Sequence, residues 1–354
     1  MKLRVLRSPW VSISLVLAVL IGTGLLLWWR GPDWSLVADA FTAVRWEWVA
    51  AAVGLNLLSV VVRAAAWDTA IRSAMPPPHP GGPLVFSAFC VGLLANAVLP
   101  GRVGELARVA VLTRRLNGRP GAWPTLVGTV FAHRVFDLVP VMMLVSWVLI
   151  AAKIPGWAFT SLAVVLSLGV ALFLFAFATA RHHHRTRLDG LGDVRRVVMM
   201  ARHGLGVLRR PGPAALAILC QCVGWTCQLF AVWTAMRAFH IYEPLPAAGL
   251  VLVLMNVATI VPLWPGNVGL VQVAVATPLL QYGVAYEKGI AYGFGLQAIE
   301  ASVGVGAGLL FLAKEGLSFA SLRGMPGAAE AEVPRPESER GRRRRLRDRV
   351  RVPG

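Results

Sequence analysis

The chain has 354 residues, of which 56% are hydrophobic and 15% are charged, and its mean hydropathy is +0.64. This composition excludes a soluble globular domain and is typical of a polytopic helical membrane protein. The net charge of +18 could indicate nucleic acid, but the Lys and Arg side chains sit in loops and a tail beside apolar segments. No zinc-finger, RNP or helix-turn-helix signature accompanies them. We therefore attribute the charge to membrane topology and anionic lipid, and expect no nucleic-acid partner.

The first apolar run, residues 10–29, is long enough to span a bilayer and follows the basic residues Lys2, Arg4 and Arg7. Basic residues before a first span favour a cytoplasmic N-terminus, and the run is longer than a signal-peptide core. We expect an uncleaved anchor. Residues 30–48 follow on the outer side and mix apolar with charged side chains, which predicts a short amphipathic surface helix.

Charge asymmetry between the loops predicts where the other spans lie. A second span at about residues 48–66 returns the chain to a basic cytoplasmic stretch that contains Arg63 and Arg72. Residues 181–211 carry eight Arg against two Asp and form the clearest cytoplasmic loop. Four more spans are expected at about residues 124–150, 157–180, 213–236 and 289–313.

Two further apolar segments are each interrupted by the same pattern, Pro-Gly-x-Val-Gly. It occupies residues 100–104 and returns 165 positions later at residues 265–269. Proline removes a backbone donor and glycine permits positive φ, so both sites should break a helix, which at membrane depth requires surrounding protein or water. The residues expected to form these two elbows are Pro100, Gly101, Gly104, Pro265, Gly266 and Gly269.

Each elbow joins two short apolar arms whose outer ends fall on one side of the membrane. The first hairpin ends at the basic cluster of residues 114–119, predicted to be cytoplasmic, and the second ends at Glu287 and Lys288, predicted to be external. The sequence therefore predicts an all-α polytopic membrane protein with about six full transmembrane helices and two oppositely oriented re-entrant helical hairpins, as an inverted repeat produces. The alternative is eight full spans.

The residues after the first elbow carry charge where a membrane segment is expected. Arg102, Glu105 and Arg108 follow one another at i, i+3 and i+6, which places them on one helix face. Arginine donates bidentate hydrogen bonds that match a phosphodiester, and a helix beginning at Gly101 would add free N–H groups. We expect a site for a lipid headgroup. The alternative is an internal Arg102–Glu105 pair that only ties the hairpin to the bundle.

Other polar residues are candidates for the same site. Arg134 and Asp137 are spaced to pair with each other or with the first group. Polar residues in the second half are expected to line the opposite wall, with interhelical hydrogen bonding as the alternative role. These are Asn267, Gln272 and Glu300.

Three motifs in this order carry a family resemblance. They are Pro-Gly-Arg-x-Gly-Glu-x-x-Arg at residues 100–108, Arg-x-x-Asp at residues 134–137, and Pro-x-x-Pro-Gly-x-x-Gly at residues 262–269. The chain resembles, over most of residues 10–315, the flippase-like transmembrane domain of the lysylphosphatidylglycerol synthase family. The resemblance implies phospholipid translocation. The chain departs from the family pattern at Gln272 and His133, where acidic residues are frequent, and no aminoacyl-transferase domain follows.

We therefore expect a flippase-like transmembrane domain at residues 1–315 and a disordered, Arg-rich cytoplasmic tail at residues 316–354. The expected function is translocation of a phospholipid or lipid-linked anionic substrate between leaflets of the cell membrane, with both termini cytoplasmic. The alternatives are a membrane-embedded lipid-modifying transferase and a non-transporting envelope accessory subunit. No catalytic motif is found, so we expect no enzymatic activity, no cofactor and no metal. The expected partners are anionic phospholipids, with a separate lipid-modifying enzyme as a further candidate.

Overall fold

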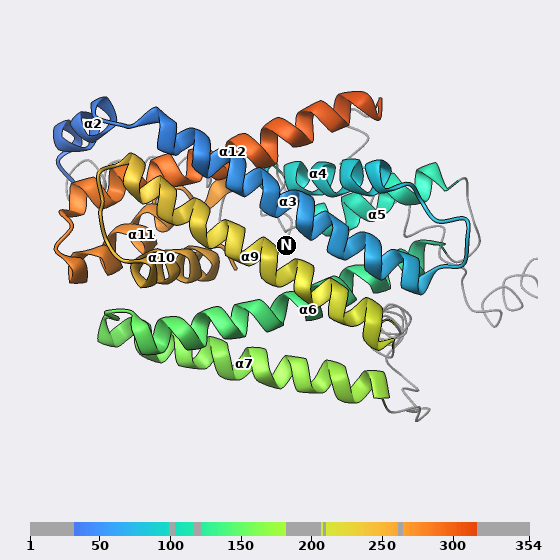
Figure 1. The fold of residues 1–354 in the computed structure, drawn as a ribbon. Coiled ribbons are helices and arrows are strands. Elements are labelled where there is room, and N and C mark those ends of the chain that lie inside the picture. The colour runs from blue at the N-terminus through green and yellow to red at the C-terminus, as the bar shows by residue number, and fades with distance from the viewer. Residues whose placement is uncertain are drawn as a thin grey trace, which may run out of the picture.

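The structure, a computed structural model, describes residues 32–98, 103–116, 122–181, 207, 210–260 and 265–316. Every regular element in these ranges is a helix (Figure 1). The elements are α2 (Trp34–Thr42), α3 (Trp46–Ala74), α4 (Gly82–Val98), α5 (Gly104–Arg115), α6 (Ala122–Ala151), α7 (Gly156–Arg181), α9 (Pro211–Ala238), α10 (Leu245–Ala258), η4 (Pro265–Asn267), α11 (Leu270–Leu279), η5 (Leu280–Tyr282) and α12 (Tyr286–Lys314).

Five described helices, α3, α6, α7, α9 and α12, are long and apolar enough to cross a membrane. They confirm the expected all-α polytopic fold and five of the six expected spans. The first expected span, residues 10–29, and the expected tail after residue 316 lie outside the described residues. The second span was predicted too short, because α3 continues to Ala74 and places Arg63 inside the helix. The expected surface helix between residues 30 and 48 is α2.

Helices α3 and α9 lie side by side and antiparallel in the middle of the bundle (Figure 1). Within this contact, the Ser59 Oγ donates a hydrogen bond of 2.8 Å to the Gly224 carbonyl oxygen. The Arg63 Nη1 lies 3.5 Å from the Gln228 Oε1. Both pairs join residues 165 positions apart, the same interval that separates the two elbows. Equivalent residues meet only where a two-fold axis passes, so the axis of the repeat lies at this contact.

The helix bounds repeat at the same interval. Adding 165 to the bounds of α3 gives residues 211–239, and α9 occupies Pro211–Ala238. The same shift takes α6 to residues 287–316, where α12 occupies Tyr286–Lys314, and takes α4 and α5 to within five residues of the bounds of α10 and α11. The inverted repeat predicted from the elbows therefore includes four consecutive helices in each half.

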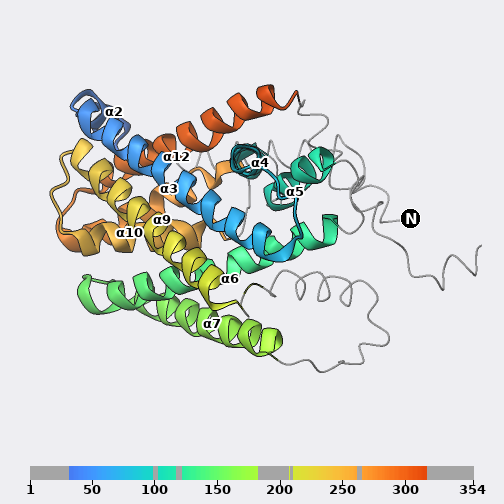
Figure 2. The same cartoon turned by 45° about the vertical axis from the view of Figure 1, so that its right-hand side comes forward.

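The hairpins α4–α5 and α10–α11 enter the bundle from opposite ends, as both ribbon views show (Figures 1 and 2). Each arm is shorter than the roughly 20 residues that a full span needs. The end of α5 is tied to the end of α12 by an ion pair between Arg115 and Glu315 with a distance of 2.8 Å. The start of α3 is tied to the opposite end, where the Arg45 N–H donates to the Ala238 carbonyl oxygen at 3.0 Å.

The first elbow depends on close contact between its arms. The Gly104 N–H donates to the Asn96 Oδ1 at 2.8 Å, so a side chain satisfies the first backbone donor of α5. A Cβ atom at Gly92 would lie 2.9 Å from the Gly104 carbonyl oxygen. Helix α5 begins at Gly104 rather than at Gly101 as expected. Pro100, Gly101 and Arg102 lie outside the described residues.

The second elbow contains residues with left-handed backbone. Gly266 and Gly269 have φ values of 70° and 93°, and Asn267 between them has a φ of 46°. Glycine has no Cβ penalty in this region, and asparagine tolerates it better than most residues. The identical Pro-Gly-x-Val-Gly pattern therefore gives two glycines with positive φ at the second elbow, while Gly104 at the first elbow permits the helices to approach.

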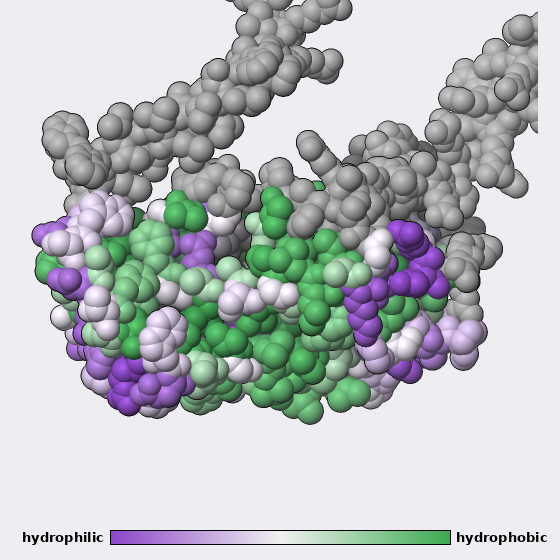
Figure 3. All heavy atoms as spheres, turned by 90° about the horizontal axis from the view of Figure 1, so that it is seen from above, coloured by the Kyte–Doolittle hydropathy of each residue, from purple (hydrophilic) through white to green (hydrophobic). Residues whose placement is uncertain are grey.

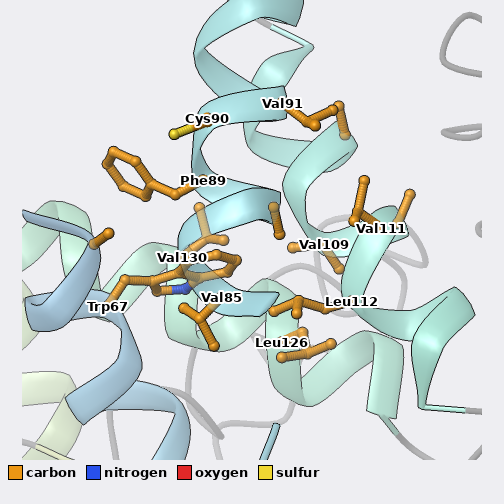
Figure 4. Packing of buried hydrophobic residues seen from close by; sticks show 14 of the residues in the cluster. Trp67, Val85, Phe89, Cys90, Val91, Val109, Val111, Leu112, Leu126 and Val130 are labelled. Atoms are coloured by element: carbon orange, nitrogen blue, oxygen red, sulfur yellow. The ribbon is translucent and has the colours of Figure 1, made fainter. Parts of the chain in front are cut away.

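Buried apolar residues fasten the first hairpin to the long helices. Trp67 from α3 lies among Val85 and Phe89 of α4 and side chains from α5 and α6 (Figure 4). A second core joins α9, α10, α11 and α12 around Tyr292. Seen from above, an apolar surface lies between polar groups at the two ends of the bundle (Figure 3). This distribution is that of a membrane protein whose helices run from one polar end to the other.

The close contact between α3 and α9 can be tested by replacing Gly224. In Gly224→Val the new Cβ would lie 2.6 Å from the Arg63 Cγ, so either the Arg63 side chain or α9 itself must move. Overpacking of this kind costs about 1–3 kcal/mol. We expect a lower unfolding temperature of the purified protein in detergent. Gly212→Val is the control, because Gly212 begins the same helix with nothing within 4 Å. Equal unfolding temperatures for the two variants would contradict close packing of α9 against α3 at Gly224.

Candidate functional site

A continuous set of polar side chains, the charge network, begins on the helix that follows the first elbow. Glu105 on α5 forms an ion pair with Arg108 one turn later. The same carboxylate also pairs with Arg134 on α6. These contacts join the re-entrant hairpin to a membrane-spanning helix by charge.

Asp137 is the centre of the network. Arg134 reaches its Oδ2 at 3.2 Å from the same helix, and Arg63 reaches it at 3.2 Å from α3. The indole N–H of Trp225 on α9 donates to the other carboxylate oxygen, Oδ1, at 3.0 Å. Three helices thus provide donors to one buried carboxylate, which satisfies the requirement that a charge inside a membrane protein be paired and hydrogen-bonded.

The network continues across the two-fold axis. Arg63 contacts the Gln228 side chain, and the Gln228 Nε2 donates to the Glu300 Oε1 on α12 at 3.4 Å. Of the candidates predicted from the sequence that lie in the described ranges, the structure therefore connects Glu105, Arg108, Arg134, Asp137 and Glu300. Arg63 and Gln228 complete the connection.

The two arginines that pair with Glu105 have different environments. The Arg108 guanidinium is buried and stacks over the Trp67 ring, with 4.5 Å from its Cζ to the ring centroid, and 5.3 Å from Phe89. The Trp67 ring is itself held by a hydrogen bond of 3.1 Å to the Thr129 Oγ1. Arg108 is thus enclosed by aromatic rings. The Arg134 side chain is 50% exposed, so Arg134 is the arginine of this pair that a ligand can reach.

Among the described residues, the ion pairs of the network join three arginines, Arg63, Arg108 and Arg134, to two carboxylates, those of Glu105 and Asp137. Glu300 accepts a hydrogen bond from the Gln228 amide and also interacts electrostatically with Arg63. A charged residue at the centre of a membrane helix costs about 2.5–3.5 kcal/mol on insertion scales, so the half-exposed Arg134 favours an anionic ligand beside it.

Asn267 and Gln272 lie apart from this network and bond their own elbow. The Asn267 Nδ2 donates to the Ala258 carbonyl oxygen at 2.9 Å, and the Gln272 Oε1 accepts from the Gly269 N–H at 2.6 Å. Gln272 then donates to Gln297 at 2.6 Å, and Gln297 donates to the Gly266 carbonyl oxygen. These amides satisfy the broken backbone of the second elbow, and the expected role of Asn267 and Gln272 in a second ligand wall stays a prediction.

Three residues of the charge network were not predicted from the sequence: Arg63, Trp225 and Gln228. Arg63 was assigned to a cytoplasmic stretch, although apolar residues flank it on both sides. The repeat interval offered a signal, because Arg63 and Gln228 are 165 positions apart and polar in otherwise apolar runs. His133, where the chain departs from the family pattern, is buried with its Nε2 3.3 Å from the Gln221 amide nitrogen.

The importance of the Asp137 pairing can be measured by removing Arg63. Arg63→Gln leaves a buried carboxylate with one fewer cation, and breaking a buried pair costs about 3–5 kcal/mol. We expect a clear fall in unfolding temperature, partly reversed in the double variant with Asp137→Asn. The control is Arg72→Gln on the same helix, where the pair with Asp68 lies at the helix end and is worth about 0–1 kcal/mol. An equal effect of both single variants would contradict the central role of Asp137.

The comparison with known proteins agrees with the geometry. Residues 15–308 match the family model described as the lysylphosphatidylglycerol synthase TM region. No curated protein and no solved structure matches the chain. The family match includes both elbows and every long helix described above except the last six residues of α12, far more than half of the sequence. The chain therefore belongs to the lysylphosphatidylglycerol synthase transmembrane-region family.

Proposed function

We propose that this protein translocates a phospholipid, or a lipid-linked substrate with an anionic headgroup, between the leaflets of the cell membrane. Membership of the family supports a membrane protein that handles lipid. The observation that carries the finer proposal is the half-exposed guanidinium of Arg134 within the charge network. A phosphodiester carries the negative charge that this cation attracts, and its two oxygens match the planar guanidinium.

The inverted repeat supports transport through the same site. Two hairpins enter from opposite ends and meet near the middle, where η4 packs against α4 (Figures 1 and 2). In transporters with inverted repeats, substrate sites lie near the midplane beside broken helices, and movement of one repeat against the other exposes them alternately. The charge network extends from the first hairpin to α12 of the second repeat, so movement between the halves would act on it.

A lipid-modifying transferase is the second candidate, and the geometry favours it less. His133 and Asp137 have a spacing that a general base and its partner could use. In the structure the His133 ring lies beside the Gln221 amide, and Asp137 accepts from Arg63, Arg134 and Trp225. A carboxylate so fully bonded is a poor candidate for orienting a catalytic base. We propose that the polypeptide carries no enzymatic activity, and that its membrane partners are anionic phospholipids supplied by a separate enzyme.

The proposal is tested in liposomes that contain a fluorescent phosphatidylglycerol or a fluorescent phosphatidylcholine. We expect the wild-type protein to exchange the anionic lipid between leaflets faster than the zwitterionic one. Arg134→Gln should slow the anionic exchange about 10- to 100-fold, because a hydrogen bond to a charged group is worth about 1.5–3 kcal/mol. Arg72→Gln, at the end of α3, should exchange like the wild type.

Two results would contradict the proposal. Absence of exchange with either lipid, in protein that unfolds at the wild-type temperature, would favour an accessory subunit. Equal exchange of both lipids would show that Arg134 does not select an anionic headgroup. Covalent change of the lipid recovered from the vesicles would instead support the transferase.

A further inference from the structure

The two repeats differ at the face where the second arm of each hairpin meets the following long helix. In the first repeat, α5 lies against α6. Leu106 on α5 and Phe131 on α6 are each 38% exposed. Arg134, one turn after Phe131 on α6, has a half-exposed side chain and pairs with Glu105 on α5. This face combines exposed apolar side chains with an accessible ion pair.

The positions 165 residues later are closed and apolar. They are Val271 on α11 and Leu296 and Ile299 on α12, and each is 5% exposed or less. Glycines on α12 permit this close packing. A Cβ at Gly289 would lie 2.9 Å from the Ala276 Cα, and a Cβ at Gly293 would lie 3.0 Å from the Gln272 Cα. The α11–α12 contact thus has no room for a ligand between its helices.

The contrast is informative because the repeat makes the two contacts topologically equivalent. Helices α11 and α12 nevertheless pack more closely than α5 and α6 do. Apolar contact along α11 and α12 is replaced along α5 and α6 by an ion pair whose cation remains accessible. An accessible pair contributes little to holding two helices together, and a competing anion can replace its carboxylate.

We propose that a phospholipid reaches the charge network sideways, between α5 and α6, and that the equivalent α11–α12 contact remains closed. The headgroup phosphate binds Arg134 in place of the Glu105 carboxylate. The acyl chains lie along Leu106 and Phe131. The proposal rests on the proposed function and adds the route by which the lipid reaches the site.

The position of Arg134 indicates why the occupant is a lipid rather than a soluble anion. Arg134 lies 12 residues after the start of α6, about 18 Å along the helix axis. An exposed guanidinium this far from the helix start is stabilised by an anion or water rather than by acyl chains. Leu106 and Phe131 offer only apolar surface beside it. Among anions, a phospholipid has both a phosphate that can bind Arg134 and hydrocarbon chains that can contact Leu106 and Phe131.

The test places the photo-crosslinking residue p-benzoylphenylalanine at Phe131 in full-length protein, in vesicles of equal phosphatidylglycerol and phosphatidylcholine. We expect adducts enriched several-fold in phosphatidylglycerol. The same residue at Phe175, exposed on α7, reports the bulk membrane and should give no enrichment. At Leu296, the equivalent of Phe131, it should give few adducts. Arg134→Gln should lower the enrichment at position 131 to the bulk value and leave position 175 unchanged.

Adducts at position 131 with the bulk lipid ratio would overturn the proposal, as would equal enrichment at positions 131 and 296. The liposome assay separates this result from the proposed function. Normal anionic exchange without enrichment at position 131 would show that transport occurs by another route. Enrichment without exchange would support the lateral lipid site and contradict translocation.

Discussion

The constraint on which the structure depends is that charge inside a membrane protein must be paired. Asp137 meets it with donors from three helices: Arg134 on its own helix, Arg63 from α3 and Trp225 from α9. Each donor must come from a helix that passes the centre of the bundle, so the carboxylate fixes how α3, α6 and α9 sit together. Glu105 adds the hairpin through Arg134. The same contacts that stabilise the bundle therefore assemble the only extended charged network among the described residues.

The backbone follows a two-fold repeat, but the chemistry is one-sided. At the axis, Arg63 of the first repeat meets Gln228 of the second. Along α6, Arg134 is charged and accessible, whereas its equivalent on α12, Ile299, is buried. A symmetric scaffold requires only that apolar faces and breaks recur at the same interval. Placing the ion pairs of the network in the first half gives that half a polar, accessible face, and the second half contributes Glu300.

The described parts of the two elbows are stabilised by different contacts. At the first, the Asn96 side chain accepts from the Gly104 N–H and the absence of a side chain at Gly104 lets α5 approach α4. At the second, two glycines adopt left-handed backbone, and Gln272 and Gln297 satisfy the freed groups. In both cases protein amides replace the water that a broken helix would otherwise need in a membrane. Polar residues near an elbow are thus needed for the break itself, before any ligand is considered.

The sequence alone determined the class of fold, the elbows, the opposite hairpins and the family, because apolar run length, helix breakers and loop charge are local properties. It also identified Glu105, Arg108, Arg134 and Asp137, because charge in an apolar run stands out. It misplaced Arg63 and missed Trp225, since a polar residue near a predicted helix end resembles a loop residue until the helix is seen to continue. Only the tertiary structure decided that Asn267 and Gln272 serve the elbow, that Glu300 joins the network through Gln228, and that Arg134 is accessible while Arg108 is enclosed. These outcomes depend on which helices pack together, and contacts between residues far apart in the chain leave no periodic signal in the sequence.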